Sequence, residues 1–249
     1  MPRENSSSTA TDPPSANEIV SSAEAFKIAA ADPALNEDLA LALLQRTDLP
    51  PEFFNQLAKN PSVVKRRKVK LAIIGHPKTP RYVSIALLRQ LFTFDLMRVA
   101  LTPVISGDIK AAAEELLIKR LESIATGERM SLARRATGRV AGALLLDPDV
   151  RVIQTALQNS RLTEALVVKA LMGAGSPAAL VRTVCEHNKW SLRREIRIAL
   201  LGHAKTPIRF AEEFSKTLPV VQLRDILHSS RLPAAMKKNL LKQSHLKTH

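Results

Sequence analysis

Apolar residues recur at three- and four-residue spacing along most of the chain, in short segments separated by turn signals. This spacing places apolar side chains on one face of a helix, and it outweighs the alternation typical of strands. The turn signals are Asp-Pro, Asn-Pro, Ser-Pro and similar pairs, which end one helix and begin the next. The pattern therefore predicts an all-α protein made of many short helices.

The turn signals recur at a regular distance. Asp32 and Asn60 are 28 residues apart, and so are Asn159 and His187. A period of this length is typical of helix pairs that stack on one another, because one amphipathic pair cannot bury its apolar face without neighbours. We therefore expect an α-solenoid of antiparallel helix pairs.

A longer duplication supports this prediction. Residues 66–81 (RRKVKLAIIGHPKTPR) and residues 193–208 (RREIRIALLGHAKTPI) are identical at eight of sixteen positions. Both copies contain Gly-His-x-Lys-Thr-Pro. We expect Gly75 and Gly202 to end a helix in the left-handed conformation and Thr-Pro to begin the next helix. The motif is therefore predicted to be a joint between two helices.

The segment between the two copies departs from the short-repeat pattern. Residues 107–146 predict two longer central helices. The first is capped by Asp108, and the second covers residues 130–146 after a break at residues 126–128. The repeats are therefore expected to be irregular in the middle of the chain.

The ends of the chain differ in composition from its middle. Residues 1–22 are rich in Ser, Thr, Pro and Asn, so we expect a disordered tail there, a helical-repeat domain over residues 23–243 and a short tail over residues 244–249. The longest apolar run is far shorter than a membrane span requires. A single cysteine, Cys185, cannot form an internal disulfide, which fits a cytoplasmic protein. Cys185 is predicted to be buried, with a reactive thiol beside His187 as the alternative.

Charge narrows the choice of partners. The chain has 37 Lys and Arg against 23 Asp and Glu, a formal net charge of +14. Such an excess favours an anionic partner, which can be nucleic acid, an acidic membrane surface or an acidic protein. Residues 53–94 contain nine basic residues and no acidic one. We therefore expect most of the positive excess in this region.

Two clusters of cations are the main candidates for contact with a partner or with phosphate. Residues i, i+1 and i+4 share one face of a helix, so each copy of the motif presents three cations. They are Arg66, Arg67 and Lys70 in the first copy and Arg193, Arg194 and Arg197 in the second. Lys78 and Lys205, with His76 and His203, stand near the next helix start, where free N–H groups bind anions. The alternative is that these side chains bond to neighbouring repeats and serve the stacking.

Four further side chains are candidates. Arg134, Arg135 and Arg139 form a basic group on a central helix, either a binding surface or a solvated face. Trp190 can stack on a partner or pack between repeats. The chain contains no Walker loop, dinucleotide fingerprint, His-Glu-x-x-His or Gly-x-Ser-x-Gly motif, and no His and Cys set at metal-ligand spacing. We therefore predict no catalytic residue, no metal and no cofactor.

Three recurring steps carry a resemblance to known proteins. Residues 57–61 (LAKNP), 157–163 (LQNSRLT) and 201–207 (LGHAKTP) resemble the HEAT-like and leucine-rich-repeat-variant families of bacterial helical repeats. The resemblance covers nearly all of residues 30–243 and implies a right-handed solenoid, but no particular activity. The related HEAT-like DNA glycosylases are similar in length, charge and composition. Their paired aromatic and acidic residues have no evident counterpart around Trp190.

The leading hypothesis is a non-enzymatic helical-repeat scaffold that binds a protein partner through its solenoid surface. The alternative is a nucleic-acid-binding protein with a basic groove, related to the HEAT-like glycosylases. A third hypothesis is attachment to acidic lipid through residues 236–247, where Lys237, Lys238, Lys242 and Lys247 lie beside leucines.

Overall fold

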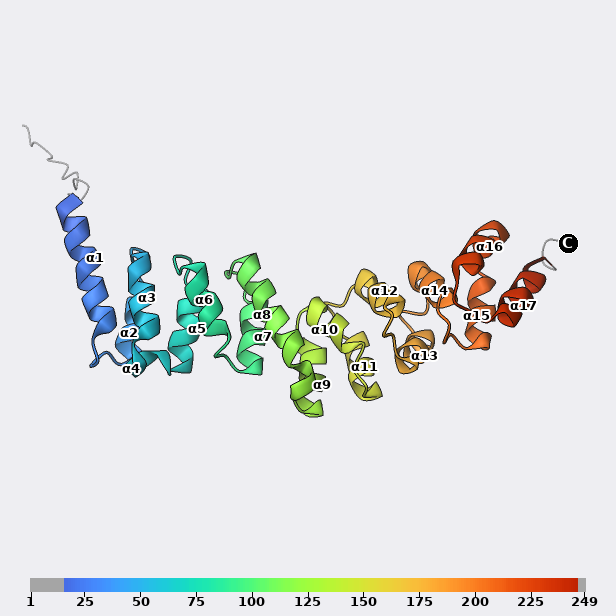
Figure 1. Cartoon of the computed structure of the whole chain (residues 1–249), viewed down its shortest axis with the longest axis horizontal. Helices are drawn as coiled ribbons and strands as arrows, with labels where there is room; N and C mark the ends of the chain where they lie inside the picture. The colour runs from blue at the N-terminus through green and yellow to red at the C-terminus, as the bar shows by residue number, and fades with distance from the viewer. Residues whose placement is uncertain (1–15, 246–249) are drawn as a thin grey trace, which may run out of the picture. The chain divides into compact units, whose positions relative to one another are not determined.

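The computed structural model describes residues 16–245, with the side chains of residues 24–243. All regular secondary structure in this part of the chain is helical, so the predicted all-α class is confirmed. The chain divides into two units. Unit 1 is Met1–Asp95 with Pro103–Ile109, and unit 2 is Leu96–Thr102 with Lys110–His249. The boundary falls within helices α7 (Thr93–Leu101) and α8 (Gly107–Arg120), which are labelled in Figure 1.

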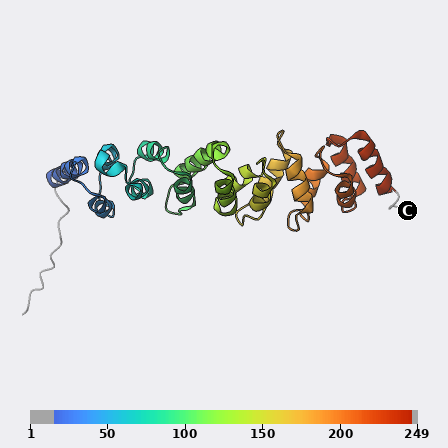
Figure 2. The same cartoon turned by 90° about the horizontal axis from the view of Figure 1, so that it is seen from below.

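Unit 1 opens with six helices that pack in two rows. They are α1 (Ala16–Ala31), α2 (Glu37–Leu43), α3 (Pro51–Lys59), α4 (Pro61–Val64), α5 (Arg67–Gly75) and α6 (Arg81–Leu88). α1, α3 and α6 pack on one another in sequence, while α2 and α5 form the second row. Figure 2 shows these blue to teal helices nearly end-on, one row above the other.

Local sequence sets the ends of these helices. α3 begins with Pro51 and α4 with Pro61, in the first turn, where the missing N–H has no intrahelical partner to lose. Asn36 caps α2, because its side-chain oxygen accepts a hydrogen bond from the N–H of Leu39 at 2.9 Å. Asn60-Pro61, at the start of α4, is one of the turn signals that the sequence repeats.

Aromatic side chains fill the core of unit 1. α3 buries Phe53, Phe54 and Leu57 on one face. The Phe53 ring lies edge-on to Phe54, with ring centroids 5.5 Å apart, and edge-on to Phe26 of α1 at 6.3 Å. Full burial of such side chains stabilises each by roughly 1.5–3 kcal/mol relative to exposure.

Unit 2 continues with nine α-helices and a short 3-10 helix among the described residues. They are η1 (Leu121–Ser123), α9 (Thr126–Arg135), α10 (Gly138–Leu144), α11 (Val150–Leu157), α12 (Glu164–Met172), α13 (Ala178–Glu186), α14 (Arg194–Leu201), α15 (Ile208–Ser215), α16 (Val220–Ser229) and α17 (Ala234–His245). α10, α12, α14 and α16 pack on one another in sequence. α9, α11 and α13 form the other row, and Figure 1 shows the two rows along this unit.

The prediction of a second long central helix is wrong. Residues 126–144 form two short helices, α9 and α10, separated at Ala136 and Thr137. The amide of Asn159 donates hydrogen bonds to the carbonyl oxygens of Ala133 (2.8 Å) and Ala136 (3.1 Å). The end of α9 is therefore capped by the following repeat instead of continuing as helix.

The prediction that Gly75 and Gly202 adopt the left-handed backbone conformation is also wrong. No described residue has a positive φ. Gly202 has φ −76° and ψ −17°, and the chain leaves α5 through His76 in extended backbone. A histidine side chain forms each turn instead, and nothing in the structure explains a glycine at position 75.

The predicted tails lie mostly outside the described residues. α1 begins at Ala16, so the helix starts within the segment expected to be a tail, and α17 extends to His245. Residues 1–15 and 246–249 are not among the described residues.

Candidate partner-binding surface

The first Gly-His-x-Lys-Thr-Pro motif forms the turn between α5 and α6, as predicted. Nδ1 of His76 accepts a hydrogen bond from the backbone N–H of Lys78 (3.2 Å), and the Thr79 hydroxyl donates to the carbonyl oxygen of Ile73 (2.6 Å). Nε2 of His76 lies 2.9 Å from the carbonyl oxygen of Arg46. A neutral ring with its proton on Nε2 satisfies both contacts. The imidazole therefore acts as a turn-forming group.

The second motif has the same local structure between α14 and α15. Nδ1 of His203 accepts from the backbone N–H of Lys205 (3.1 Å), and the Thr206 hydroxyl donates to the carbonyl oxygen of Leu200 (2.6 Å). The Lys205 ammonium also donates to the carbonyl oxygen of Ser176 at 2.8 Å. The two joints are therefore equivalent, and the Lys205 side chain is held by the fold.

The first cation cluster divides into different environments. Arg67 holds the buried carboxylate of Asp95 with its Nε atom at 2.7 and 2.9 Å from the two oxygens. Arg66 and Lys78 are exposed and Lys70 is half-buried. These three side chains make no hydrogen bond or ion pair with any residue that the structure describes.

The second cluster divides in a similar way. Arg193 is exposed at the start of α14, without a side-chain partner in the described part of the chain. Arg194 pairs with the adjacent Glu195 at 2.9 Å, and both are exposed. Arg197 donates to the carbonyl oxygen of Ser191 at 2.7 Å. At the first position of the cluster, Arg66 and Arg193 both lack a side-chain partner among the described residues. No other position of the cluster is unpaired in both copies.

Two other candidates belong to the core. Trp190 is 2% exposed, and its Nε1 atom donates to the carbonyl oxygen of Leu157 at 2.8 Å, so its ring packs inside the fold and is not open to stacking on a partner. Cys185 is 3% exposed. Burial, reinforced by the Glu186 carboxylate, raises the pKa of Cys185 to about 12. A buried thiol with so high a pKa is a poor nucleophile.

The central basic group does not lie on one helix. Arg134 and Arg135 are in the last turn of α9, whereas Arg139 is on α10. Arg139 lies 3.5 Å from Glu114, and the Arg135 carbonyl oxygen accepts a long contact from Arg161 at 3.4 Å. The break between α9 and α10 therefore separates the predicted cluster.

The positive charge of residues 53–94 is largely balanced by acidic residues elsewhere in unit 1. Side chains in the acid-free stretch, residues 53–94, pair with acids outside it: Arg81 with Asp108 at 2.7 Å and Lys68 with Glu37 at 3.6 Å. Unit 1 contains 12 Lys and Arg against 11 Asp and Glu, whereas unit 2 contains 25 against 12. Nearly all of the net charge therefore belongs to unit 2.

The sequence pattern marks Asn60 and Asn159 as turn signals but does not show how they join neighbouring helix pairs. Asn60 is 4% exposed, and its amide donates to the carbonyl oxygens of Ala30 (2.9 Å) and Asp32 (2.8 Å), one repeat earlier. Its oxygen accepts from the N–H of Ser62. The only signal in the sequence is an amide side chain at a helix end.

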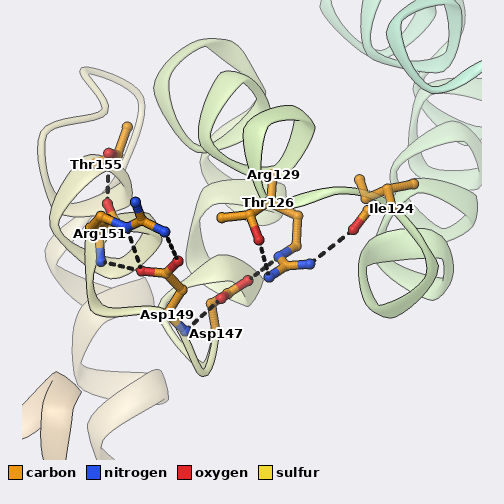
Figure 3. A network of polar contacts seen from close by, with 7 residues as sticks. All are labelled: Ile124, Thr126, Arg129, Asp147, Asp149, Arg151 and Thr155. Carbon is orange, nitrogen blue, oxygen red and sulfur yellow. Dashed lines mark hydrogen bonds and ion pairs between the residues drawn. The ribbon is translucent and has the colours of Figure 1, made fainter.

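The sequence pattern gives no sign of an ion pair in unit 2, drawn in Figure 3, between half-buried Arg129 and buried Asp147. Nε of Arg129 lies 2.7 Å from Asp147, and the same guanidinium donates to the Ile124 carbonyl oxygen and the Thr126 hydroxyl. Asp147 in turn accepts from the N–H of Asp149. The pair borders an open, largely apolar cavity of about 420 Å³. Its geometry clamps α9 to the turn after α10.

The apolar side of α17 is used within the fold. Leu240 is fully buried, and the helix packs on α15 and α16. Lys237 donates to the carbonyl oxygen of Ser230 at 2.6 Å, and Lys247 lies outside the described residues. Within residues 16–245, no helix has the length and apolar character needed to cross a bilayer. The described side chains also contain no cluster of three or more His, Cys, Asp or Glu able to hold a metal ion.

Comparison of the chain with protein-family models, with curated proteins and with solved structures finds no match.

Proposed function

We propose that the chain is a HEAT-like helical-repeat scaffold, a right-handed α-solenoid, which binds a protein partner through the surface of its stacked helix pairs. The observation that carries this proposal is the equivalence of the joints around His76 and His203, with the same hydrogen bonds in both copies. Repeated helix pairs offer an extended surface. Such a surface is suited to a second macromolecule.

Contacts between successive repeats support the proposal. Asn60 bonds to Ala30, 30 residues earlier, and Lys205 bonds to Ser176, 29 residues earlier. Polar side chains thus reach back by about one repeat in each unit, as stacking of adjacent repeats requires.

Cross-linking with mass spectrometry tests this function. The purified full chain is incubated with an extract of the cells that make it, beside an unrelated basic protein of equal net charge. We expect at least one protein to be enriched over the control and cross-linked to exposed helix residues. If no protein exceeds the control, the scaffold proposal is wrong.

Nucleic-acid binding is the second candidate, and the charge of unit 2 favours it. Mobility shifts with a 20-base-pair DNA duplex and an RNA hairpin, from 50 to 300 mM salt, decide this point. A protein that neutralises Z phosphates shows a slope of about −0.9Z in log K against log salt on duplex DNA. No shift at 50 mM salt eliminates the candidate.

A further inference from the structure

Exposed cations recur at the turns of unit 2 that follow α9, α11, α13 and α15, or in the last turn before them. We call them the joint cations: Arg134, Arg161, Lys189, Arg193 and Lys216. Three of them, Arg134, Arg193 and Lys216, have no side-chain hydrogen bond or ion pair with the described residues. Lys189 rests over the Trp190 ring at 4.2 Å, and Arg161 makes only a 3.4 Å contact with a carbonyl oxygen. All five charges therefore remain available to a partner.

Hydrogen bonds place the first two of these turns side by side. Asn159, in the turn after α11, donates to the carbonyl oxygens of Ala133 and Ala136 at the end of α9. A Cβ atom at Gly138 would lie only 2.2 Å from the carbonyl oxygen of Arg161, so the two turns are in direct backbone contact. Arg134 and Arg161 therefore belong to one edge of the unit.

Side chains connect the remaining turns to this edge. Trp190, in the turn after α13, donates to the carbonyl oxygen of Leu157 at the end of α11. Arg197 donates to Ser191 in that same turn, and its guanidinium lies 5.3 Å from the ring centroid of Phe214 in the last turn of α15. The four turns are therefore linked one to the next by side-chain contacts, and the joint cations follow this line of turns.

Carboxylates stand among the joint cations. Glu164 is the first residue of α12, and Glu195 is in the first turn of α14. Duplex DNA carries one negative charge per about 1.7 Å and would meet these carboxylates as well as the cations. A protein segment differs from DNA in this respect, because it can carry acidic side chains at the positions that face the cations and uncharged side chains at the positions that face the carboxylates. The mixed charge of this edge therefore favours an acidic protein segment over a nucleic acid.

The spacing of the joint cations further limits where acidic residues can stand in the sequence of the partner segment. Packed helices lie roughly 8–10 Å apart, and this distance sets the step between the joint cations of one turn and those of the next turn. A segment in the extended polyproline II conformation rises about 3.1 Å per residue and has three residues per turn, so every third side chain lies on the same face and one step corresponds to about three residues. We propose that the partner docks an extended segment along the joint cations, with Asp or Glu at about every third residue. This inference rests on the proposed scaffold function.

Two synthetic peptides of identical composition test the spacing. In one labelled 13-residue Gly/Ser peptide, Glu occupies every third position, and in the other the same glutamates are contiguous. We expect the spaced peptide to bind the full chain about fivefold more tightly by fluorescence anisotropy at low salt, because only its charges match the line. Equal affinities would overturn the proposed spacing.

Charge reversal tests the location. The double variant Arg161→Glu/Lys189→Glu should weaken binding of the spaced peptide by about tenfold, since it replaces attraction by repulsion at two adjacent turns. The matched control, Lys59→Glu/Lys65→Glu, makes the same charge change at exposed positions of unit 1 and should change affinity less than about twofold. Circular dichroism and Tm check that both variants are folded. Equal effects of the two variants would overturn the proposal.

Two further measurements separate this inference from its alternatives. If a 20-base-pair duplex binds more tightly than the spaced peptide and is lost in Arg161→Glu/Lys189→Glu, the edge serves nucleic acid and the inference fails. If the variant and the unmodified chain cross-link to the same protein partner equally well, the scaffold function stands but the partner docks elsewhere.

Discussion

Single side chains form the turns of this chain by bonding to the backbone two residues ahead. Asn60, His76, Asn159, His187 and His203 each accept the N–H of residue i+2 through a side-chain oxygen or Nδ1. The sequence identifies these residues as turn signals. It does not show which of them also reach the preceding repeat, because that depends on where the neighbouring helix ends.

Asn159→Ala should lower the free energy of unfolding by about 1–3 kcal/mol in urea titrations. The substitution leaves two buried carbonyl oxygens at the end of α9 without their donors. Asn159→Asp is the matched variant, because it keeps the acceptor for Arg161 but removes the amide donors, and it should be at least as destabilising. A loss below about 0.5 kcal/mol for Asn159→Ala would show that the amide does not stabilise the joint.

Acidification should destabilise the fold through two histidines. Burial lowers the pKa of His187, helped by Lys189, and lowers the pKa of His203, helped by Lys205 and Arg231. Because the folded state favours the neutral rings, their contribution is fully present above the unfolded pKa of about 6.5 and is lost as pH falls through the lowered values. Urea unfolding between pH 7.5 and 5 should show this decline.

The double variant His187→Asn/His203→Asn provides the control. An Asn side chain accepts the same N–H bond at Asn159 and does not titrate. The decline between pH 7 and 5 should therefore be smaller than in the unmodified chain. An identical decline would assign the pH dependence to other groups.

At the scale of helices, the sequence predicts most of the starts and misses one of the ends. Pro51 and Pro61 begin helices because their local chemistry suffices. The break at Ala136 has no such signal, because the donors that cap α9 belong to Asn159. Likewise, the ion pair between Arg129 and Asp147 depends on the turn after α10. Features made by two repeats together are therefore not evident from either segment alone.

Gly138→Ala should lower the free energy of unfolding by about 2 kcal/mol or more. Its Cβ atom would approach the Arg161 carbonyl oxygen to 2.2 Å, and this is backbone that cannot rotate away. Gly142→Ala is the matched control on the same helix, with ordinary contacts of 3.4 Å to Leu166. The control should be neutral or stabilising by up to about 1 kcal/mol, because Ala favours helix. Equal effects would show that α10 does not pack closely on the turn.

Asp147→Ala should destabilise unit 2 by about 3 kcal/mol, measured by denaturant unfolding. The change leaves the Arg129 guanidinium, whose side chain is 15% exposed, without its counter-charge. In Arg129→Met/Asp147→Ala no uncompensated charge remains, so the double variant should be more stable than Asp147→Ala. A double variant that is less stable would contradict this role of the charge.

At the scale of the whole chain, the all-α class and the repeated joints are evident from the sequence, but the charge distribution is not. The stretch over residues 53–94 is acid-free in sequence, yet Asp95 and Asp108 bond to its arginines from the following repeats. Unit 2 has no acid-free stretch of that length and nevertheless holds nearly all of the net charge. Charge balance in a repeat protein is set between repeats as well as along the sequence.

Asn60→Ala should have a local effect measurable by hydrogen exchange. Repeats contact mainly their neighbours, so destabilisation at one joint decays along the chain. We expect faster exchange in α1 and α3 and unchanged protection in α12 and α14. Uniform acceleration across both units would show that the chain unfolds as a single cooperative body.

The side-chain bonds to backbone carbonyls between repeats have one direction. Asn60, His76, Asn159, Trp190 and Lys205 all contact carbonyl oxygens that lie 23 to 33 residues earlier. During synthesis, the newest helix pair therefore emerges from the ribosome before the groups that will cap its carbonyls. The carbonyl groups of each pair are capped only after roughly one more repeat has been translated. Completion of the fold therefore lags behind elongation of the nascent polypeptide by about one repeat.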